Sequence, residues 1–443
     1  MALPSWVLHS RRKLSQLLKY GCQVFRLPQL LARLKDSRRE PRIPTFDVVN
    51  SLFHTALLRI PSINALEGDL KESDFQALLG KAASPDVKLF SAEVVSNVLD
   101  KLDVSRIRQA MLEVFNKAER NKAFRDQTYG ALRCVAVDGW EAFTSYHRHC
   151  PDCLERQVVV EEETVTQYYH RYVVALFIGP LLDVVLDIEP IRNKAARIRA
   201  GESNVDEDEG EQTAALRLLD RLHQTYGTII DAISFDSLYP NGPVLNKVAQ
   251  CGYGAFIIVK KKHNQPLKEA LALWRGQPPC RVVHDPNSGE DIEFWDTDPM
   301  EVLDTYKGPI RVIRARVTQP RGKKKKRTWC IAVVGKRAMR APLTAILKAA
   351  RARWHIENTA FHQWVMYWNL NHVFRHTANA TLAVLLLWSL AFNLLQFFVY
   401  RRLKRQRNPK DPTDTIRHIV EVINREIATL VEPIPWAALL DTS

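Results

Sequence analysis

The sequence lacks several features that would place it in a well-known class of protein. Its seven cysteines are an odd number scattered over 443 residues, which argues against the disulfide framework of small secreted domains. The opening stretch MALPSWVLHSRRK has no sustained apolar run before its charges, so no signal peptide is expected. The chain also has no internal repeat and no glycine-rich Walker loop, so no nucleotide cofactor is implied. Together these absences predict a protein of the reducing cytoplasm.

Acidic residues are also in deficit. The chain has 63 Lys and Arg against 49 Asp and Glu, a net charge of +14 and a pI near 9.4. A basic excess of this size favours a polyanionic partner, and nucleic acid is the usual one. The alternative is a surface charge that only keeps the protein soluble. An apolar content of 46% is that of an ordinary globular protein.

One long segment lacks charge altogether. The stretch TLAVLLLWSLAFNLLQFFVY (381–400) is followed at once by RRLKR, and its length suits a membrane span. However, Ser389, Asn393 and Gln396 recur at i, i+4 and i+7 and form one polar stripe along the helix. Such side chains can hydrogen-bond to neighbours inside a protein but are costly in lipid. We therefore predict a buried helix of a soluble protein and keep a membrane anchor as the alternative.

The apolar periodicity changes along the chain and divides it into regions. Helical spacing dominates the first part, which is rich in Arg and Lys between Arg11 and Arg42, and short apolar runs typical of strands begin at LRCVAVD (132–138). The order of strands and helices that follows predicts a mixed α/β sheet. The expected regions are a helical DNA-binding N-terminal region (1–125), an α/β domain (126–262 and 337–405), a β-rich insertion (263–336) and a helical tail (406–443).

Three carboxylates stand out within the α/β domain. Asp138 and Asp236 are predicted to end the first and fourth strands of the sheet, where α/β folds place catalytic groups. Glu357 shares a helical stripe with Phe361, Trp364 and Trp368, a face that would normally exclude water. Carboxylates brought together repel one another unless a cation neutralises them. A cluster of oxygen ligands suits Mg²⁺ or Mn²⁺, and a pair of such ions is the usual device for phosphodiester chemistry.

Each carboxylate also has a structural alternative. Asp138 precedes a glycine and can initiate a turn, Asp236 can cap the next helix, and Glu357 can pair with Arg353 four residues earlier. Asp183, Asp187 and Glu189 alternate along a predicted strand and form a rival acidic set. The acidic run DEDEGE (206–211) is interpreted as a solvated loop and a helix N-terminus.

The stretches VAVDGWEAF, FDSLYPNGPVLNKV and RWHIENTAFHQW resemble the DDE-type transposases of bacterial insertion sequences, and the resemblance runs from about Leu132 to Tyr400. It implies an RNase H-like catalytic domain with a β-rich insertion before the glutamate. It also implies that Asp138, Asp236 and Glu357 bind two Mg²⁺ or Mn²⁺ ions, and that Arg353 binds a phosphate. The implied partners are double-stranded DNA, namely the terminal repeats and the target, and a second copy of the chain in a homodimer.

The sequence departs from the family pattern at two positions. Many relatives carry a Tyr three residues before the helix arginine and a Lys seven residues after the glutamate, where this chain has Ala350 and Trp364. Arg351 and His355 are candidates to replace the phosphate contacts of those residues. The departures keep open the alternative of a DNA-binding protein that has the fold without catalysis.

Two further stretches allow two interpretations each. YHRHCPDCLER offers His147, His149, Cys150 and Cys153 as zinc ligands, or a turn between strands with free thiols. RGKKKKR is interpreted as a hairpin tip that is either solvated or in contact with the DNA backbone. Its DNA-binding candidates are Lys323, Lys324, Lys325, Lys326 and Arg327. Trp329, just after it, is expected to pack in the core or to stack on an unpaired base.

Overall fold

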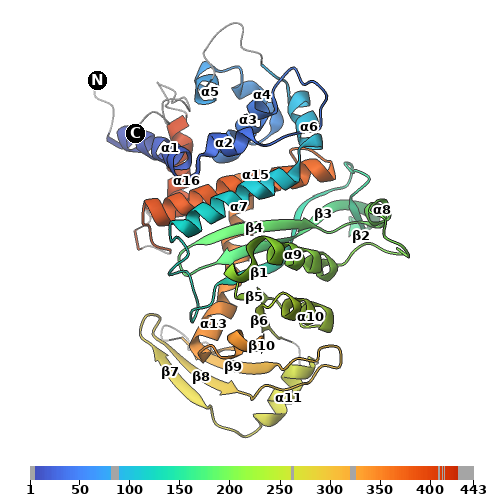
Figure 1. Cartoon of the computed structure of the whole chain (residues 1–443), viewed down its shortest axis with the longest axis vertical. Coiled ribbons are helices and arrows are strands. Elements are labelled where there is room, and N and C mark those ends of the chain that lie inside the picture. The colour runs from blue at the N-terminus through green and yellow to red at the C-terminus, as the bar shows by residue number, and fades with distance from the viewer. Residues whose placement is uncertain are drawn as a thin grey trace.

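The computed structural model describes residues 5–80, 89–260, 264–319, 326–407, 410–411, 413 and 415–427. Helices of the N-terminal region lie at one end, an α/β sheet occupies the middle, and the strands of the insertion lie at the other end (Figure 1). The sheet has ten strands, in the order β2-β3-β1-β5-β6-β10-β9-β8-β7, with β4 paired to β3 off this path. The predicted mixed α/β fold is therefore confirmed.

The centre of the sheet carries the RNase H-like strand order. The strand β1 (Cys134–Ser145) pairs antiparallel with β3 (Glu163–Ile178), which pairs antiparallel with β4 (Asp183–Pro190). On its other side β1 pairs in parallel with β5 (Ala232–Phe235), and β5 pairs in parallel with β6 (Gly254–Ile258). Three antiparallel strands followed by two parallel ones, in the order β4-β3-β1-β5-β6, agree with the fold that the resemblance implies.

The predicted end of the first strand is wrong. Asp138 was expected to close it, but β1 continues to Ser145, and β2 (Leu154–Val160), which was not predicted, pairs with the first half of β3. Glu141 and other polar residues hide this extension from an apolar pattern. The long arm is held by cross-strand pairs instead, such as the two bonds at 2.8 and 2.9 Å from Arg156 to Glu141.

The β-rich insertion does not form a separate layer. Its strand β10 (Lys326–Val334) pairs antiparallel with β6, and the other three insertion strands follow, so the insertion prolongs the sheet of the α/β domain (Figure 1). The bounds of the insertion elements are α11 Gln265–Leu273, β7 Arg281–Asp285, β8 Glu290–Asp296 and β9 Arg311–Thr318. Lys326 and Arg327 are exposed at the start of β10, whereas Lys323, Lys324 and Lys325 lie outside the described residues.

The N-terminal helices pack on the sheet through one long helix, α15 (Ala378–Phe397). This helix lies beside α7 and between β4 and the N-terminal helices (Figure 1), and buried residues of all these elements share one apolar core. The C-terminal α16 (Ile416–Ile427) packs on α1, where Glu426 accepts bonds from the backbone N–H groups of Lys13 and Leu14. The N-terminal helices are α1 Ser5–Phe25, α2 Leu27–Ala32, α3 Thr45–Leu58, α4 Ile63–Asp69, α5 Ser73–Leu78, α6 Ala92–Lys101 and α7 Val104–Arg120.

The apolar segment that resembles a membrane span is enclosed by the protein. The helix from Ala378 to Arg402 is long and apolar enough to cross a membrane, but its most apolar window is entirely buried inside the chain. Of the three polar residues of its stripe, Asn393 uses both amide atoms: it donates to Val185 O and accepts from Val185 N, each at 2.8 Å. Asn393 thereby satisfies both backbone groups of Val185 at the open edge of β4. Ser389 Oγ and the Gln396 amide find no hydrogen-bond partner among the described residues.

The remaining helices flank the sheet or connect its strands. They are α8 Lys194–Arg199, α9 Glu211–Tyr226, η1 Gly227–Ile229, α10 Gly242–Gln250, α12 Lys336–Met339, α13 Leu343–Ala352, η2 Ile356–Phe361, α14 His362–Trp368 and η3 Phe398–Arg402. Helix α10 is capped by Asn241, whose side chain accepts from Val244 N, so the alternative that Asp236 caps this helix is wrong.

Replacing Asn393 with Leu is expected to destabilise the protein by about 1–3 kcal/mol, because both backbone groups of Val185 would be buried without partners. Gln396→Met is the matched control on the same helix, since Gln396 is buried and its amide makes no hydrogen bond, among the described residues, that the substitution could remove. Thermal unfolding should show a clear decrease in Tm for the first variant and none for the second. Equal Tm values for the two variants would contradict this role of Asn393.

Candidate active site

Two of the predicted carboxylates lie at the same place in the sheet. The parallel pairing of β1 with β5 ends at Ala136 and Ser234, so Asp138 follows it on β1 and Asp236 follows the last residue of β5. Asp138 remains paired with Val174 of β3, which holds its backbone in the sheet. Asp138 Oδ1 accepts from Gly139 N at 2.9 Å, and Asp236 Oδ1 accepts from Leu238 N at 2.8 Å. The prediction that both acids meet at this edge agrees with the structure.

Glu357 reaches the same edge from a π-helix. The helical stretch after α13 changes into a six-residue π-helix, η2 (Ile356–Phe361), before continuing as α14. Wide turns of this type are frequent at functional sites. Trp364 lies behind Glu357 and is fully buried, and it packs against Trp140 of β1 with ring centroids 5.1 Å apart. The Glu357 side chain is 37% exposed, so the aromatic face anchors the helix while the carboxylate stays at the surface of the site.

A buried arginine joins two of the acids. Arg353 Nη1 donates to Asp138 Oδ2 at 2.7 Å, and Nη2 donates to Glu357 Oε1 at 2.8 Å. The arginine side chain is only 3% exposed. The predicted pairing of Glu357 with Arg353 is therefore present, but it is one half of a bridge that extends to the sheet. Arg353 therefore lies between the two carboxylates and bonds to both.

The electrostatics show an excess of negative charge at this edge. Burial raises the pKa of Asp138 to about 6; the charge of Arg353 lowers it, and the charges of Asp236 and Glu211 raise it further. One guanidinium thus does not balance the acids around Asp138. A raised carboxyl pKa next to other carboxylates is typical of functional sites.

Glu211 is a fourth acid that the sequence interpretation missed. It begins α9, its side chain is 7% exposed, and it accepts bonds from Arg171 Nη2 at 2.5 Å and from the Tyr239 hydroxyl at 2.6 Å. Burial and the charges of Glu211, Asp138 and Asp236 raise the pKa of Tyr239 well above its usual value. Glu211 closes the acidic run that was interpreted as a solvated loop. Only its position at the first residue of an amphipathic helix distinguished it from the rest of the run.

Asp183, Asp187 and Glu189, the rival acidic set, form ion pairs with residues of neighbouring elements. Asp183 is fully buried and bonds Arg407 Nη1 at 2.6 Å and His355 Nδ1 at 3.2 Å. Asp187 pairs with Arg108 and Arg221, and Glu189 pairs with Arg217 and Arg221. Each acid of the set is matched by at least one arginine, so these groups bind arginines of neighbouring elements rather than gathering around a common point.

Arg351 and His355, the candidates to replace the missing family residues, also bond to carboxylates of the protein. Arg351 forms two bonds with Glu290 of β8, at 2.7 and 3.0 Å, and His355 contacts Asp183. Trp329 of β10 is half-buried, with Arg351 5.8 Å from its ring centroid. The structure therefore gives no support to Arg351 or His355 as phosphate ligands in this state.

The residues present fit a divalent cation. Asp138, Asp236, Glu357 and Glu211 offer only carboxylate oxygens, the donor set that Mg²⁺ and Mn²⁺ prefer. Burial and then the charges of Asp236 and Glu211 raise the pKa of Asp138, and a bound cation would offset these effects. Asp138, Asp236 and Glu357 would hold the ions, and Glu211 lies behind them in bonds to Arg171 and Tyr239.

An RNase H-like sheet with acids from β1, the end of β5 and a later helix is the arrangement that the resemblance to DDE-type transposases implies. Comparison with family models agrees: residues 204–394 match the transposase DDE domain. The predicted resemblance to DDE-type transposases is thereby confirmed. The matched range contains Glu211, Asp236 and Glu357, whereas Asp138 precedes it.

Relatives outside the family model are distant. No curated protein matches the chain. Among solved structures, a piggyBac transposase in a synaptic complex with hairpin DNA aligns with 98% of this chain and 84% of its own, at 13% identity and a TM-score of 0.39. A likeness at this level does not bear on the roles of individual residues.

Gly139→Ala is expected to disturb the acid cluster, because a Cβ at this position would meet Glu211 Cδ at 2.6 Å. Glu211 would be pushed from Arg171 and Tyr239, and both Tm and Mn²⁺ affinity should fall. Gly68→Ala is the control, since no described atom lies within 4 Å of a Cβ there. Calorimetric titration with Mn²⁺ and thermal unfolding measure both effects. Wild-type behaviour of Gly139→Ala would mean that Glu211 is not held against β1 as described.

Proposed function

We propose that this protein is a DNA transposase that catalyses metal-dependent phosphodiester hydrolysis and strand transfer at the ends of an insertion sequence. Transposases of the matched family are in general nucleases and strand transferases that use divalent metal ions. The observation that carries the proposal is the convergence of Asp138, Asp236 and Glu357 on one sheet edge, with Arg353 bridging two of them.

In the proposed mechanism, Asp138 and Asp236 would hold the metal ions from the sheet, and Glu357 would hold them from the helix. Two bound Mg²⁺ or Mn²⁺ ions supply activation of water or of a DNA 3′-hydroxyl and stabilisation of the leaving oxygen. The aromatic packing of Trp140 against Trp364 fixes the distance between sheet and helix on which this coordination depends.

Arg353 is the residue proposed to respond to DNA. Its guanidinium neutralises Asp138 and Glu357 in the present state. With cations bound at the acids, Arg353 would no longer be needed to neutralise them, and its planar guanidinium could bind a phosphate bidentately. The residue that stabilises the acids before binding would then stabilise the phosphate at the site.

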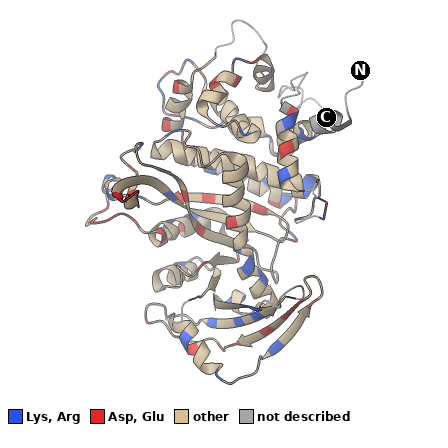
Figure 2. Cartoon of the chain, turned by 180° about the vertical axis from the view of Figure 1, so that it is seen from behind, with Lys and Arg blue, Asp and Glu red and all other residues tan. Residues whose placement is uncertain are grey.

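The basic charge of the chain supports double-stranded DNA as the partner. Figure 2 shows Lys and Arg along the insertion strands, but several of these are paired, as Arg311 is with Asp296 and Arg316 with Glu293. The exposed Lys326 and Arg327, with the preceding lysines of the RGKKKKR stretch, are proposed to contact the backbone. We further propose that the basic N-terminal region binds the terminal repeats, that a homodimer holds two element ends, and that the protein acts in the cytoplasm.

Glu357→Gln is expected to abolish cleavage of element-end DNA in Mg²⁺ or Mn²⁺ while DNA binding persists, because the change removes one charge and keeps the shape of the side chain. Glu269→Gln, on α11 of the insertion, is the control and should cleave as wild type does. Cleavage by Glu357→Gln at the wild-type rate would show that the acids are misassigned. If the wild type binds DNA but does not cleave it, the alternative of a DNA-binding protein without catalysis would be favoured.

Replacing Lys323, Lys324, Lys325, Lys326 and Arg327 together with Gln should weaken binding to specific and unrelated duplexes alike. The slope of log K against log salt should become shallower by about 0.9 for each phosphate that the variant no longer neutralises. Lys268→Gln with Arg275→Gln, two exposed residues elsewhere on the insertion, is the control. An unchanged slope in fluorescence anisotropy titrations would remove this segment from the DNA interface.

A further inference from the structure

We propose that Cys150, Cys153, His170 and His376 form a structural zinc site, separate from the carboxylate site. One ligand atom of each residue lies within 4.8 Å of those of the other three. The cysteines come from the loop between β1 and β2, His170 from β3, and His376 from the loop before α15. Two thiolates and two imidazoles are a ligand set that zinc prefers.

Four of the six distances among these ligand atoms are close to those of a tetrahedral zinc site. The two sulfur atoms are 3.7 Å apart. A tetrahedral ion with Zn–S bonds of ~2.3 Å separates two sulfurs by ~3.8 Å, whereas a disulfide requires ~2.0 Å. His170 Nε2 lies 3.3 Å from Cys150 Sγ and 3.7 Å from Cys153 Sγ, and His376 Nδ1 lies 4.0 Å from Cys153 Sγ. Sulfur and nitrogen ligands of one zinc ion are ~3.5 Å apart, so small shifts bring all four atoms to bonding distance.

The loop that carries the cysteines is shaped for this role. Cys150 N donates to Cys153 Sγ at 3.2 Å, and Cys153 N donates to Cys150 O at 3.1 Å, which closes a tight turn. Asn193 Nδ2 donates to the carbonyls of Pro151 and Cys153, each at 2.9 Å. The Asn193 bonds hold the loop in place, and the N–H of Cys150 would favour a thiolate at Cys153.

The ligands differ from the set that the sequence spacing suggested. His147 and His149 are exposed and outside the cluster, and the ring of His149 stacks on Tyr168 with centroids 4.7 Å apart. Of the two histidines that join the cysteines, His170 is 17 residues after Cys153 and His376 is 223 residues after it. No spacing rule based on neighbouring residues identifies them.

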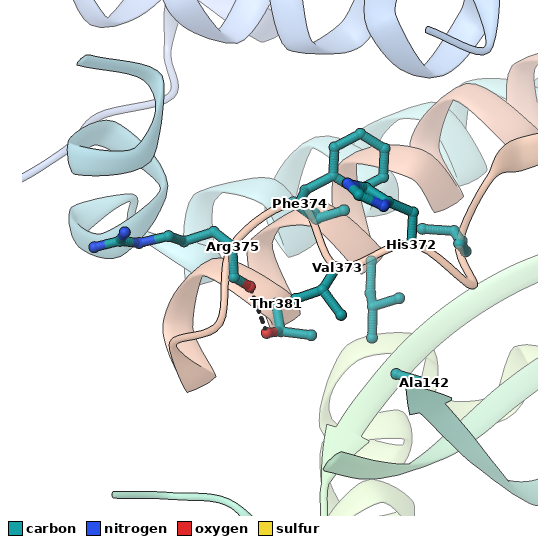
Figure 3. A pocket seen from close by; sticks show the side chains of 9 residues that line it. Ala142, His372, Val373, Phe374, Arg375 and Thr381 are labelled. Carbon is teal, nitrogen blue, oxygen red and sulfur yellow. Dashed lines mark hydrogen bonds between the residues drawn. The ribbon is translucent and has the colours of Figure 1, made fainter. Parts of the chain in front are cut away.

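The site would join the loop before α15 to strands β1 to β3 of the sheet. A cavity lies between the loop at 372–375 and Ala142 of β1, with Val373 and Thr381 on its wall (Figure 3). On the other side of the loop, Arg375 and Thr377 bond Asp100 of α6. A zinc ion bound by His376 and by the cysteines of the β1–β2 loop would therefore fix the loop between α14 and α15 to the β1–β2 end of the sheet. Four protein ligands leave no open position, so the role is structural.

The wild-type protein, expressed in zinc-supplemented medium and purified with a thiol reductant, is expected to carry about one zinc ion per chain, as a Cys₂His₂ site binds. Mass spectrometry of the metal content measures this. Replacement of the zinc by Co²⁺ should give the visible bands of a tetrahedral ion and a thiolate charge-transfer band. Chelation under denaturant-free conditions should lower Tm.

Matched variants locate the ion. Cys150→Ser and His376→Asn should lose most of the zinc, whereas Cys280→Ser, an exposed cysteine, and His149→Asn should keep it. Glu357→Gln should also keep it, which separates this proposal from the carboxylate site. If the ligand variants fail to fold, the zinc content and Co²⁺ spectrum of the wild type still decide. Wild-type protein without zinc and without a Co²⁺–thiolate band, or with a Cys150–Cys153 disulfide in its place, would overturn the proposal.

Discussion

The bridge from Asp138 through Arg353 to Glu357 is the interaction on which the rest of the site depends. It connects the central strand of the sheet to a helix more than two hundred residues later, and it does so with a charge that is nearly inaccessible to water. Neighbouring carboxylates stabilise a buried guanidinium, and the positive charge of the guanidinium reduces the repulsion between the carboxylates. Neither side of the cluster would be stable in this place without the other.

The surrounding architecture keeps this bridge in register. The sheet continues without interruption from β4 through the RNase H-like core into the insertion. Strand β5, which ends just before Asp236, therefore has paired strands on both sides. On the opposite side, α15 fills the core between β4 and the N-terminal helices. Its Asn393 bonds both backbone groups of Val185 at the edge of β4 that this helix covers. The apolar character that makes α15 resemble a membrane span is the consequence of its central position in the core.

The sequence was sufficient to predict the elements whose signal is local. The apolar strand ahead of Asp138, the strand ahead of Asp236 and the aromatic stripe of the Glu357 helix all follow from periodicity, and the acids are found because each interrupts or ends such a pattern. The long arm formed by β1 and β2 was missed because its polar residues are held by pairing across strands, which depends on register and not on composition. Glu211 and His376 were missed because their partners lie in other elements, and only the folded chain brings them together.

The π-helix at Glu357 has a consequence for how this protein can change in evolution. A single residue removed between Ile356 and Phe361 would let the segment relax into a regular α-helix, and each residue of such a helix turns the chain by about 100°. Either Glu357 would leave the acids or Trp364 would leave its place against Trp140. Substitutions in this stretch should therefore be tolerated better than insertions or deletions. Among functional relatives we expect the number of residues between the acid and the tryptophan to be conserved.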